Sequence, residues 1–166
     1  MAGLGEIAFL DIEASGLGPD TFPIEVGWAF LSGNSGSMLI KPTSDWIEDA
    51  WDETAEDLHG ISWDQLHTEG KSARFVADEL NRLLGQPGLL VLSDAPEMDG
   101  FWLGRLFEQT PADQGFQLGD FNRAFRGRFP TLDLDTLLLI AEDERHHRAE
   151  ADALLLRVIW QRALAA

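Results

Sequence analysis

EIAFLDIEASGL, residues 6–17, is the stretch that decides the fold: an apolar run that ends in two acids and then turns at a glycine. Residues 6–13 predict a buried strand, because apolar side chains dominate them and a glycine-rich turn follows at 15–19. Side chains alternate between the two faces of a strand, so Asp11 and Glu13 project from the same face. Like charges there repel and are costly to desolvate. A divalent cation between them would relieve the repulsion; the alternative is a strand end that has reached solvent.

The rest of the chain predicts a mixed α/β domain. Two further strands are expected over 24–31 and 37–40, joined by a hairpin turn at 33–36, and a later buried strand over 88–93. Helical spacing and capping residues predict helices at the following positions: 49–58, after Ser62, 72–84, 99–109, 118–125, 133–141 and 149–163. This order favours one mixed sheet flanked by helices.

Composition bounds the class of protein. The chain has 166 residues, 45% of them hydrophobic, which is enough for one globular domain with a real core. Its 12 basic residues face 29 acidic ones, a net charge of −17. Proteins that hold nucleic acid by charge are usually basic, so composition by itself favours an acidic surface or a cation-binding site. The absence of cysteine excludes disulfides and thiolate metal sites.

No feature of the sequence points to a membrane. There is no apolar run of the roughly 18 residues that a membrane span needs. Residues 1–6, MAGLGE, lack the basic segment and apolar stretch of a secretory signal. A soluble, cytoplasmic protein with no membrane partner is therefore expected.

Two more acids lie on faces that should be apolar. Asp152 and Asp99 are each followed by apolar residues three, four and seven positions later, which places each acid on the buried stripe of a helix. Such an acid needs a partner. The alternatives are favourable interaction with the helix dipole for Asp152 and an N-cap role for Asp99. Asp94, five residues earlier, is the rival candidate for the functional role considered for Asp99.

His147 stands five residues before Asp152. Inside one helix this spacing separates two side chains by roughly 140°. If His147 lies in the loop that leads into the helix, it can fold back toward the acid. The alternative is a surface or structural histidine, and the chemistry does not distinguish His147 from the adjacent His146.

The order of these segments resembles the DEDDh 3′–5′ exonucleases, the DnaQ-like enzymes that include proofreading subunits, oligoribonuclease and ribonuclease T. Residues 9–17 (FLDIEASGL) resemble the first motif, 93–103 (SDAPEMDGFWL) the second with Asp99 at the ligand position, and 147–153 (HRAEADA) the third. Residues 59–62 (HGIS) match a further common segment. The chain departs from the family at 94–97, where many members have an Asn-containing loop, and at Ala14-Ser15, where two threonines are common.

The resemblance implies an RNase H-like fold over a single exonuclease domain, residues 1–166. Its mixed sheet has five strands, the first three antiparallel, and carries helices on both faces. One strand beyond those named above is therefore expected.

The resemblance also implies the chemistry, a metal-dependent 3′–5′ exonuclease that releases nucleoside 5′-monophosphates. Two Mg²⁺ or Mn²⁺ ions would be held by hard carboxylate ligands, with Asp11 as the bridge. The ligand set is Asp11, Glu13, Asp99 and Asp152. His147 would act as the general base toward the attacking water.

The expected substrate is single-stranded or short. The excess of acid opposes long-range attraction of duplex DNA, and no residue obviously reads a 2′-hydroxyl, so both DNA and RNA are open. Expected contacts to the terminal nucleotide are Ser15, Gly16 and Leu17. Arg123, Arg126 and Arg128, interleaved with Phe121, Phe125 and Phe129, form a cluster that can track a backbone and stack bases, or a helix end whose phenyl rings pack inward.

Three rival functions remain open. The first is a catalytically inactive nuclease fold kept as a binding subunit, which the complete set of acids opposes. The second is an RNase H-like endonuclease, against which the position of His147 argues. The third is an interaction domain whose acidic surface binds cations.

Overall fold

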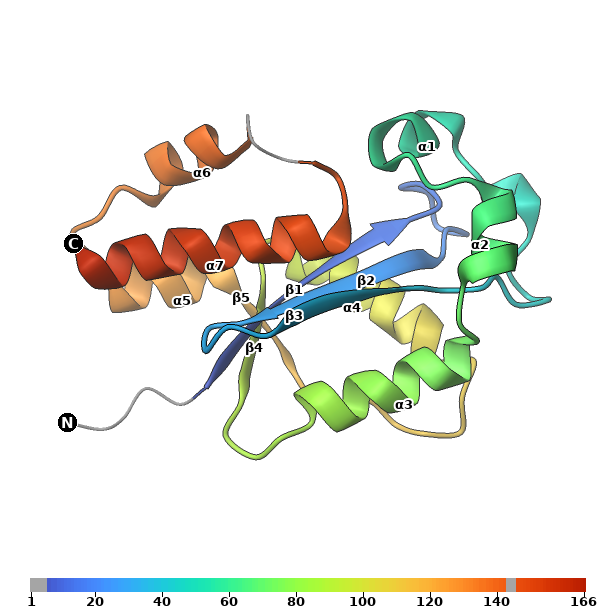
Figure 1. Cartoon of the computed structure of the whole chain (residues 1–166), viewed down its shortest axis with the longest axis horizontal. Helices are drawn as coiled ribbons and strands as arrows, with labels where there is room; N and C mark the ends of the chain where they lie inside the picture. Colours follow the sequence, from blue (N-terminus) through green and yellow to red (C-terminus); the bar gives the residue numbers. More distant parts are fainter. Residues whose placement is uncertain (1–5, 143–145) are drawn as a thin grey trace.

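A five-stranded sheet forms the centre of the molecule, in the order β3-β2-β1-β4-β5. The computed structural model describes residues 6–142 and 146–166 (Figure 1). The central strand β1 (Ile7–Ala14) pairs antiparallel with β2 (Pro23–Phe30), which pairs antiparallel with β3 (Ser35–Leu39). On the other side, β4 (Leu90–Ser93) and β5 (Leu118–Asp120) run parallel to β1. The predicted RNase H-like mixed sheet, with three antiparallel strands first, is confirmed.

The fifth strand lies in a segment that we expected to be helical. The prediction of a helix over 118–125 is wrong for its first residues, which pair with β4 from Val91↔Leu118 to Ser93↔Asp120. A strand this short has no detectable period, so its pairing with β4 decides its conformation. The helix α5 (Phe121–Arg128) begins directly after it, where the Asp120 carboxylate caps the amide of Arg123 at 3.1 Å.

The helices occupy the predicted regions with small shifts at their ends. They are a 3₁₀ turn at Glu48–Ala50, α1 (Glu53–His59), α2 (Trp63–Glu69), α3 (Ala73–Leu84), α4 (Pro96–Phe107), α6 (Leu134–Glu142) and α7 (Ala149–Ala165). The side chains of Asp52, Ser62 and Ser72 accept hydrogen bonds from the first turns of α1, α2 and α3. Gly60 ends α1 in the left-handed conformation, with φ 69°.

The two faces of β1 serve different cores, and this alternation positions the site. Ala8, Leu10 and Ile12 belong to the core that also contains residues of α3 and α4. Ile7 and Phe9 point the other way, into a second core built from α5 and α7. Figure 1 shows α7 and α3 on opposite sides of the sheet, which confirms helices on both faces. Asp11 and Glu13 continue the face of Ile7 and Phe9, so both acids face α7.

Gly27 lets α7 approach the sheet closely. It pairs with Asp11 across β1 and β2, and therefore lies on the same face. A Cβ atom built on Gly27 would lie 2.1 Å from the carbonyl carbon of Ala149 and 2.2 Å from the amide nitrogen of Glu150. Only a residue without a side chain permits this contact between β2 and the first turn of α7.

The lengths and compositions of the helices also bear on membrane insertion. Among the described residues, none of the helices combines the length and the apolar character that crossing a membrane requires.

Candidate active site

Three acids from β1 and α7 meet at one point. Asp11, Glu13 and Asp152 each offer a carboxylate oxygen, and these oxygens lie within 4.8 Å of one another. Asp11 and Asp152 are buried, with 8% and 4% of their surfaces exposed, and Glu13 is half-buried. Several buried carboxylate oxygens at this spacing form the hard donor set that Mg²⁺ and Mn²⁺ prefer. The structure thus brings together three of the four predicted ligands.

The electrostatics of Asp11 show the strain of this arrangement. Burial raises the pKa of Asp11 well above its ordinary value, and the neighbouring charges of Asp99, Glu13, Asp152 and Asp94 raise it further, in that order. Every named neighbour is an acid. A bound cation would reverse the sign of this field, which is the physical reason to expect one here.

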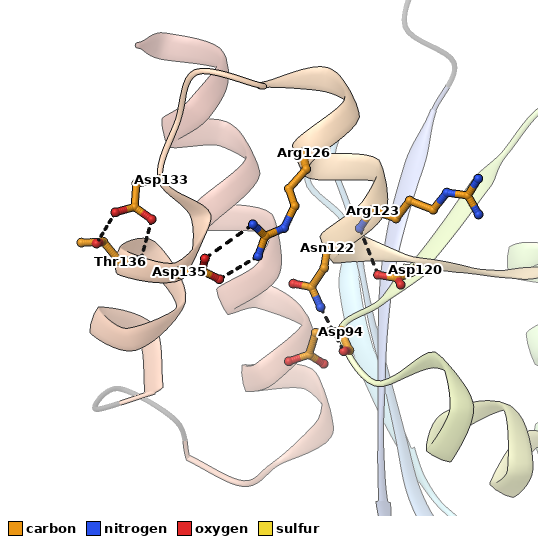
Figure 2. A network of polar contacts seen from close by, with 8 residues as sticks. All are labelled: Asp94, Asp120, Asn122, Arg123, Arg126, Asp133, Asp135 and Thr136. Atoms are coloured by element: carbon orange, nitrogen blue, oxygen red, sulfur yellow. Dashed lines mark hydrogen bonds and ion pairs between the residues drawn. The ribbon is translucent and has the colours of Figure 1, made fainter.

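Asp99 is the fourth predicted ligand. It lies in the first turn of α4, is 2% exposed, and accepts a hydrogen bond from the Ser93 hydroxyl at the end of β4. Among the neighbouring charges it acts most strongly on Asp11. Asp94, the rival candidate, is half-buried, and its backbone carbonyl accepts a hydrogen bond from Asn122 Nδ2 at 3.4 Å (Figure 2). Asp99 as the fourth ligand remains a prediction.

His147 lies where the chain turns into α7. The helix begins at Ala149, so His147 lies before it, as its folding back toward Asp152 would require. Its backbone has φ 50°, in the left-handed region that non-glycine residues seldom adopt. The side chain is half-buried and lines a pocket together with Glu13, while His146 is exposed. This geometry favours His147 over His146 as the residue next to the acids.

The pocket beside the acids has a cavity volume of about 160 Å³. Its floor is the end of β1, from Ile12 to Ala14, and α1 forms one wall. At its mouth stand the side chains of Leu17 and Leu58, which are 80% and 58% exposed. Exposed leucines beside a hollow offer an apolar surface to a ligand.

His59 contributes a polar group to the same pocket. It is buried, and burial lowers its pKa, so the neutral ring is favoured. Its Nδ1 accepts a hydrogen bond from the amide of Ile61 at 3.0 Å, so the ring proton resides on Nε2. That Nε2 has no hydrogen-bond partner among the residues that the structure describes.

The predicted contacts in the 15–17 loop differ in what they present. Ser15 is fully buried, and its hydroxyl accepts a hydrogen bond from the amide of Phe22 at 3.1 Å. Gly16 packs on Asp52, since a Cβ at this position would lie 3.0 Å from the Asp52 Cβ. Leu17 projects outward at the pocket mouth. Ser15 and Gly16 thus shape the loop that presents Leu17.

The three arginines of α5 do not converge on the acids. Arg126 forms an ion pair with Asp135 of α6, with 2.7 Å between Nη2 and Oδ1, and Arg128 lies over the ring of Phe129 at 5.3 Å. Figure 2 shows the side chains of Arg123 and Arg126 extending in opposite directions. Their role in substrate binding stays a prediction.

The phenyl rings between these arginines pack inward. Phe121 and Phe125 are fully buried and Phe129 is 9% exposed, all in the core beneath α7. Their ring centroids lie 5.3 to 5.9 Å from that of Trp160. Of the two interpretations of the basic-aromatic cluster, the structure therefore supports the packed helix end.

Sequence reasoning missed an ion pair next to the acids, between the buried Glu25 and the exposed Arg148. Glu25 on β2 is 1% exposed and accepts two hydrogen bonds from the guanidinium of Arg148, at 2.9 and 2.7 Å. The signal was visible as an acid inside the apolar strand PIEVGWAF. Its partner lies 123 residues away, which no local pattern identifies.

The comparisons with known proteins agree with the fold. The structure superposes on that of E. coli exonuclease I bound to single-stranded DNA in its zinc-bound form, with TM-score 0.70 and 16% identity over 93% of this chain and 39% of that one. The complex of the same E. coli enzyme with a dT13 oligonucleotide has TM-score 0.70 and 18% identity, over 97% of this chain and 41% of that one. The complex with a dA16 oligonucleotide has TM-score 0.72 and 17% identity, over 93% of this chain and 40% of that one.

This chain thus spans about two fifths of the length of those proteins. No family model matches the sequence, and the sequence search of curated proteins finds no match. The structural likeness establishes the RNase H-like fold.

Proposed function

We propose that this protein is a metal-dependent 3′–5′ exonuclease that shortens single-stranded nucleic acid and releases nucleoside 5′-monophosphates. The observation that carries the proposal is the meeting of Asp11, Glu13 and Asp152 within 4.8 Å beside a pocket with an apolar mouth. A site that binds only a cation would need the acids and nothing more. The adjoining pocket provides space for a nucleotide as well.

The residues present fit a divalent metal. Asp11, Glu13 and Asp152 supply hard oxygen donors, and the raised pKa of Asp11 follows from its burial and from the acids around it. Asp99 would complete the set from α4. When bound, two Mg²⁺ or Mn²⁺ ions would neutralise charge on the phosphoryl group and help ionise water.

The remaining roles belong to residues of the pocket. His147, which lines the pocket with Glu13, would take a proton from the attacking water. Leu17, exposed at the pocket mouth, can pack against the base of the terminal nucleotide. The terminal nucleotide then lies with its phosphate toward the acids.

The choice of substrate follows from charge and from the structural neighbours. A chain with net charge −17 gains little from long-range attraction to duplex DNA, so local contacts must hold the end of the strand. The similar exonuclease I structures contain single-stranded oligonucleotides, which favours single-stranded DNA. Short RNA oligomers are the second substrate to assay.

The first test follows hydrolysis from each end of a single-stranded DNA oligomer with Mn²⁺. A 5′ label is expected to report a ladder of single-nucleotide steps, and a 3′ label should appear at once in a mononucleotide. Asp152→Asn should remove the activity, because it removes a ligand of the cluster and keeps the shape of the side chain. Asp78→Asn, an exposed acid of α3, serves as the matched control.

Two results would overturn the proposal. Internal cuts would indicate an endonuclease, and an inactive wild-type protein that still binds Mn²⁺ would indicate a binding subunit. Full activity in Asp152→Asn would contradict the assigned site.

A second test addresses the pocket mouth. Leu17→Ala is expected to raise KM by about tenfold, equivalent to about 1.4 kcal/mol of lost apolar contact, and to leave kcat nearly unchanged. Leu90→Ala, an exposed leucine at the start of β4, is the control because it lies outside the pocket. Equal KM values for Leu17→Ala and wild type would remove Leu17 from the binding site.

A further inference from the structure

The buried carboxylate of Glu25 has no part in the chemistry proposed above, yet it lies beside the site. It pairs with Glu13 across β1 and β2, and so faces α7. Its two oxygens accept hydrogen bonds from Arg148 Nε at 2.9 Å and Nη2 at 2.7 Å, and Oε2 also accepts one from the amide of Ala149 at 3.1 Å. A single side chain of β2 thus holds two consecutive residues at the start of α7.

These three hydrogen bonds fix both the position and the orientation of the first turn of α7 relative to β2. A guanidinium that binds a carboxylate through two parallel hydrogen bonds cannot rotate about the contact, unlike a single-point contact. The bond to Ala149 also satisfies a free amide at the helix N-terminus and places negative charge where the helix dipole favours it. The first turn of α7 is therefore fixed to β2 at the level of Glu13.

The residue before this junction carries backbone strain. His147 has φ 50°, a conformation that costs a non-glycine residue free energy and persists only where surrounding contacts impose it. The contacts on Arg148 and Ala149 immediately follow it in the chain. Without them, the chain before α7 could relax to an ordinary conformation and carry the imidazole away from the pocket.

We propose that Glu25 and Arg148 are positioning residues, which hold the first turn of α7 so that His147 and Asp152 meet the acids of β1. The catalytic meaning of this role rests on the proposed function, but the anchoring itself does not. Arg148 is not among the three clustered acids or the residues that line the pocket, although the charge of Glu13 acts on its guanidinium. It acts by positioning His147 and Asp152.

The rest of α7 has its own attachments, so the effect should be local. Arg157 donates to the carbonyl of Gly33 at 2.8 Å, and Ala153, Leu156 and Ile159 are buried in the core beneath the helix. Loss of the ion pair should then release the first turn and leave the remaining turns in place.

The experiment replaces Arg148 by alanine and measures amide hydrogen exchange and Mn²⁺ affinity. Exchange at the hydrogen-bonded amides of the first turn, those of Ala149 and Asp152, is expected to accelerate while the amides of 156–163 keep their wild-type rates. Mn²⁺ affinity and kcat should each fall by about 10- to 100-fold, as for residues that orient metal ligands, with little change in KM. Arg148→Lys should recover part of the loss, since it restores the charge without the bidentate geometry.

The matched control is Glu150→Ala. This variant removes a different contact of the same helical turn, the exposed hydrogen bond that the Ser35 hydroxyl donates to Glu150 at 2.8 Å. Its Mn²⁺ affinity should stay within twofold of wild type, which corresponds to about 0.4 kcal/mol of binding free energy. The double variant Glu25→Gln/Arg148→Met removes the ion pair without leaving an unpaired buried charge. It should reproduce the local exchange and the affinity loss even if Arg148→Ala folds poorly.

The outcomes separate the two proposals. Wild-type exchange at Ala149 and Asp152 together with wild-type Mn²⁺ affinity in both variants would overturn the positioning role. A wild-type protein that neither binds Mn²⁺ nor hydrolyses DNA would refute the proposed function, while the exchange rates still decide whether the ion pair anchors α7. Uniform acceleration along the whole helix would also contradict the role, because it would show general destabilisation.

Discussion

Asp11→Asn is expected to make the metal-free protein more stable and to abolish both metal binding and hydrolysis. The wild-type carboxyl is buried among acids that raise its pKa, so at neutral pH its ionised form opposes folding. Asparagine has nearly the same shape without the charge. Hydrolysis should fall on the order of 10³-fold or more, corresponding to about 4 kcal/mol of lost transition-state stabilisation. Thermal unfolding with chelator and with Mn²⁺ measures the stability effect: the variant should melt above wild type in chelator and show no shift with Mn²⁺.

The pH dependence gives an independent check of the same effect. The pKa of Asp11 in the folded protein is raised above the ordinary 3.8, so the protonated side chain favours the folded state. Its contribution to the free energy of unfolding is fully present below pH 3.8 and is lost as the pH rises through the folded-state pKa. Wild-type stability in chelator should therefore decline over that range relative to Asp11→Asn. Asp20→Asn, an exposed acid of the loop after β1, controls for net charge. A lower melting temperature for Asp11→Asn in chelator would contradict this account.

Gly27→Ala is expected to have the largest effect on stability. The added methyl group would lie 2.1 to 2.4 Å from backbone atoms of Ala149 and Glu150, so α7 must move away from β2. Overpacking of this kind costs about 3 kcal/mol, which lowers the melting temperature of a chain this size by about 6–12 °C. The same displacement moves Asp152 from Asp11, so Mn²⁺ should no longer stabilise the variant.

Gly104→Ala is the matched control for this substitution. Gly104 lies within α4, is exposed, and has open space where a Cβ would stand. Alanine there should be neutral or stabilising by up to about 1 kcal/mol, because glycine is a poor helix residue. If Gly27→Ala melts like Gly104→Ala, the close approach of α7 to β2 is not a constraint on the fold.

The positions of the acids could be predicted because they break local patterns. Asp11 and Glu13 interrupt an apolar strand, and Asp152 interrupts an apolar helical stripe, so each is visible within a few residues of sequence. Their convergence depends on the alternation of β1, which sends Ile7, Phe9, Asp11 and Glu13 toward α7. The strands and most helices followed from the same periodicities.

The features that escaped prediction depend on contacts between distant segments. The three residues of β5 are a strand only because β4 lies beside them. Gly27 looks like an ordinary glycine in a strand until α7 crosses it, and Glu25 meets Arg148 across 123 positions. Likewise, the orientation of the Phe121 and Phe125 rings is set by Trp160, which comes much later in the chain.

The junction between β2 and α7 determines when the acid cluster can form during synthesis of the chain. The acid cluster needs both β1, near the start of the described chain, and α7, which follows every other described element. During synthesis the strands and the first helices emerge from the ribosome before α7 does, and until α7 docks there is no complete cluster to hold a cation. We therefore expect nascent chains to be unable to cleave nucleic acid, including the message being translated. Cations that bind only the docked form would then favour the docking of α7 by mass action.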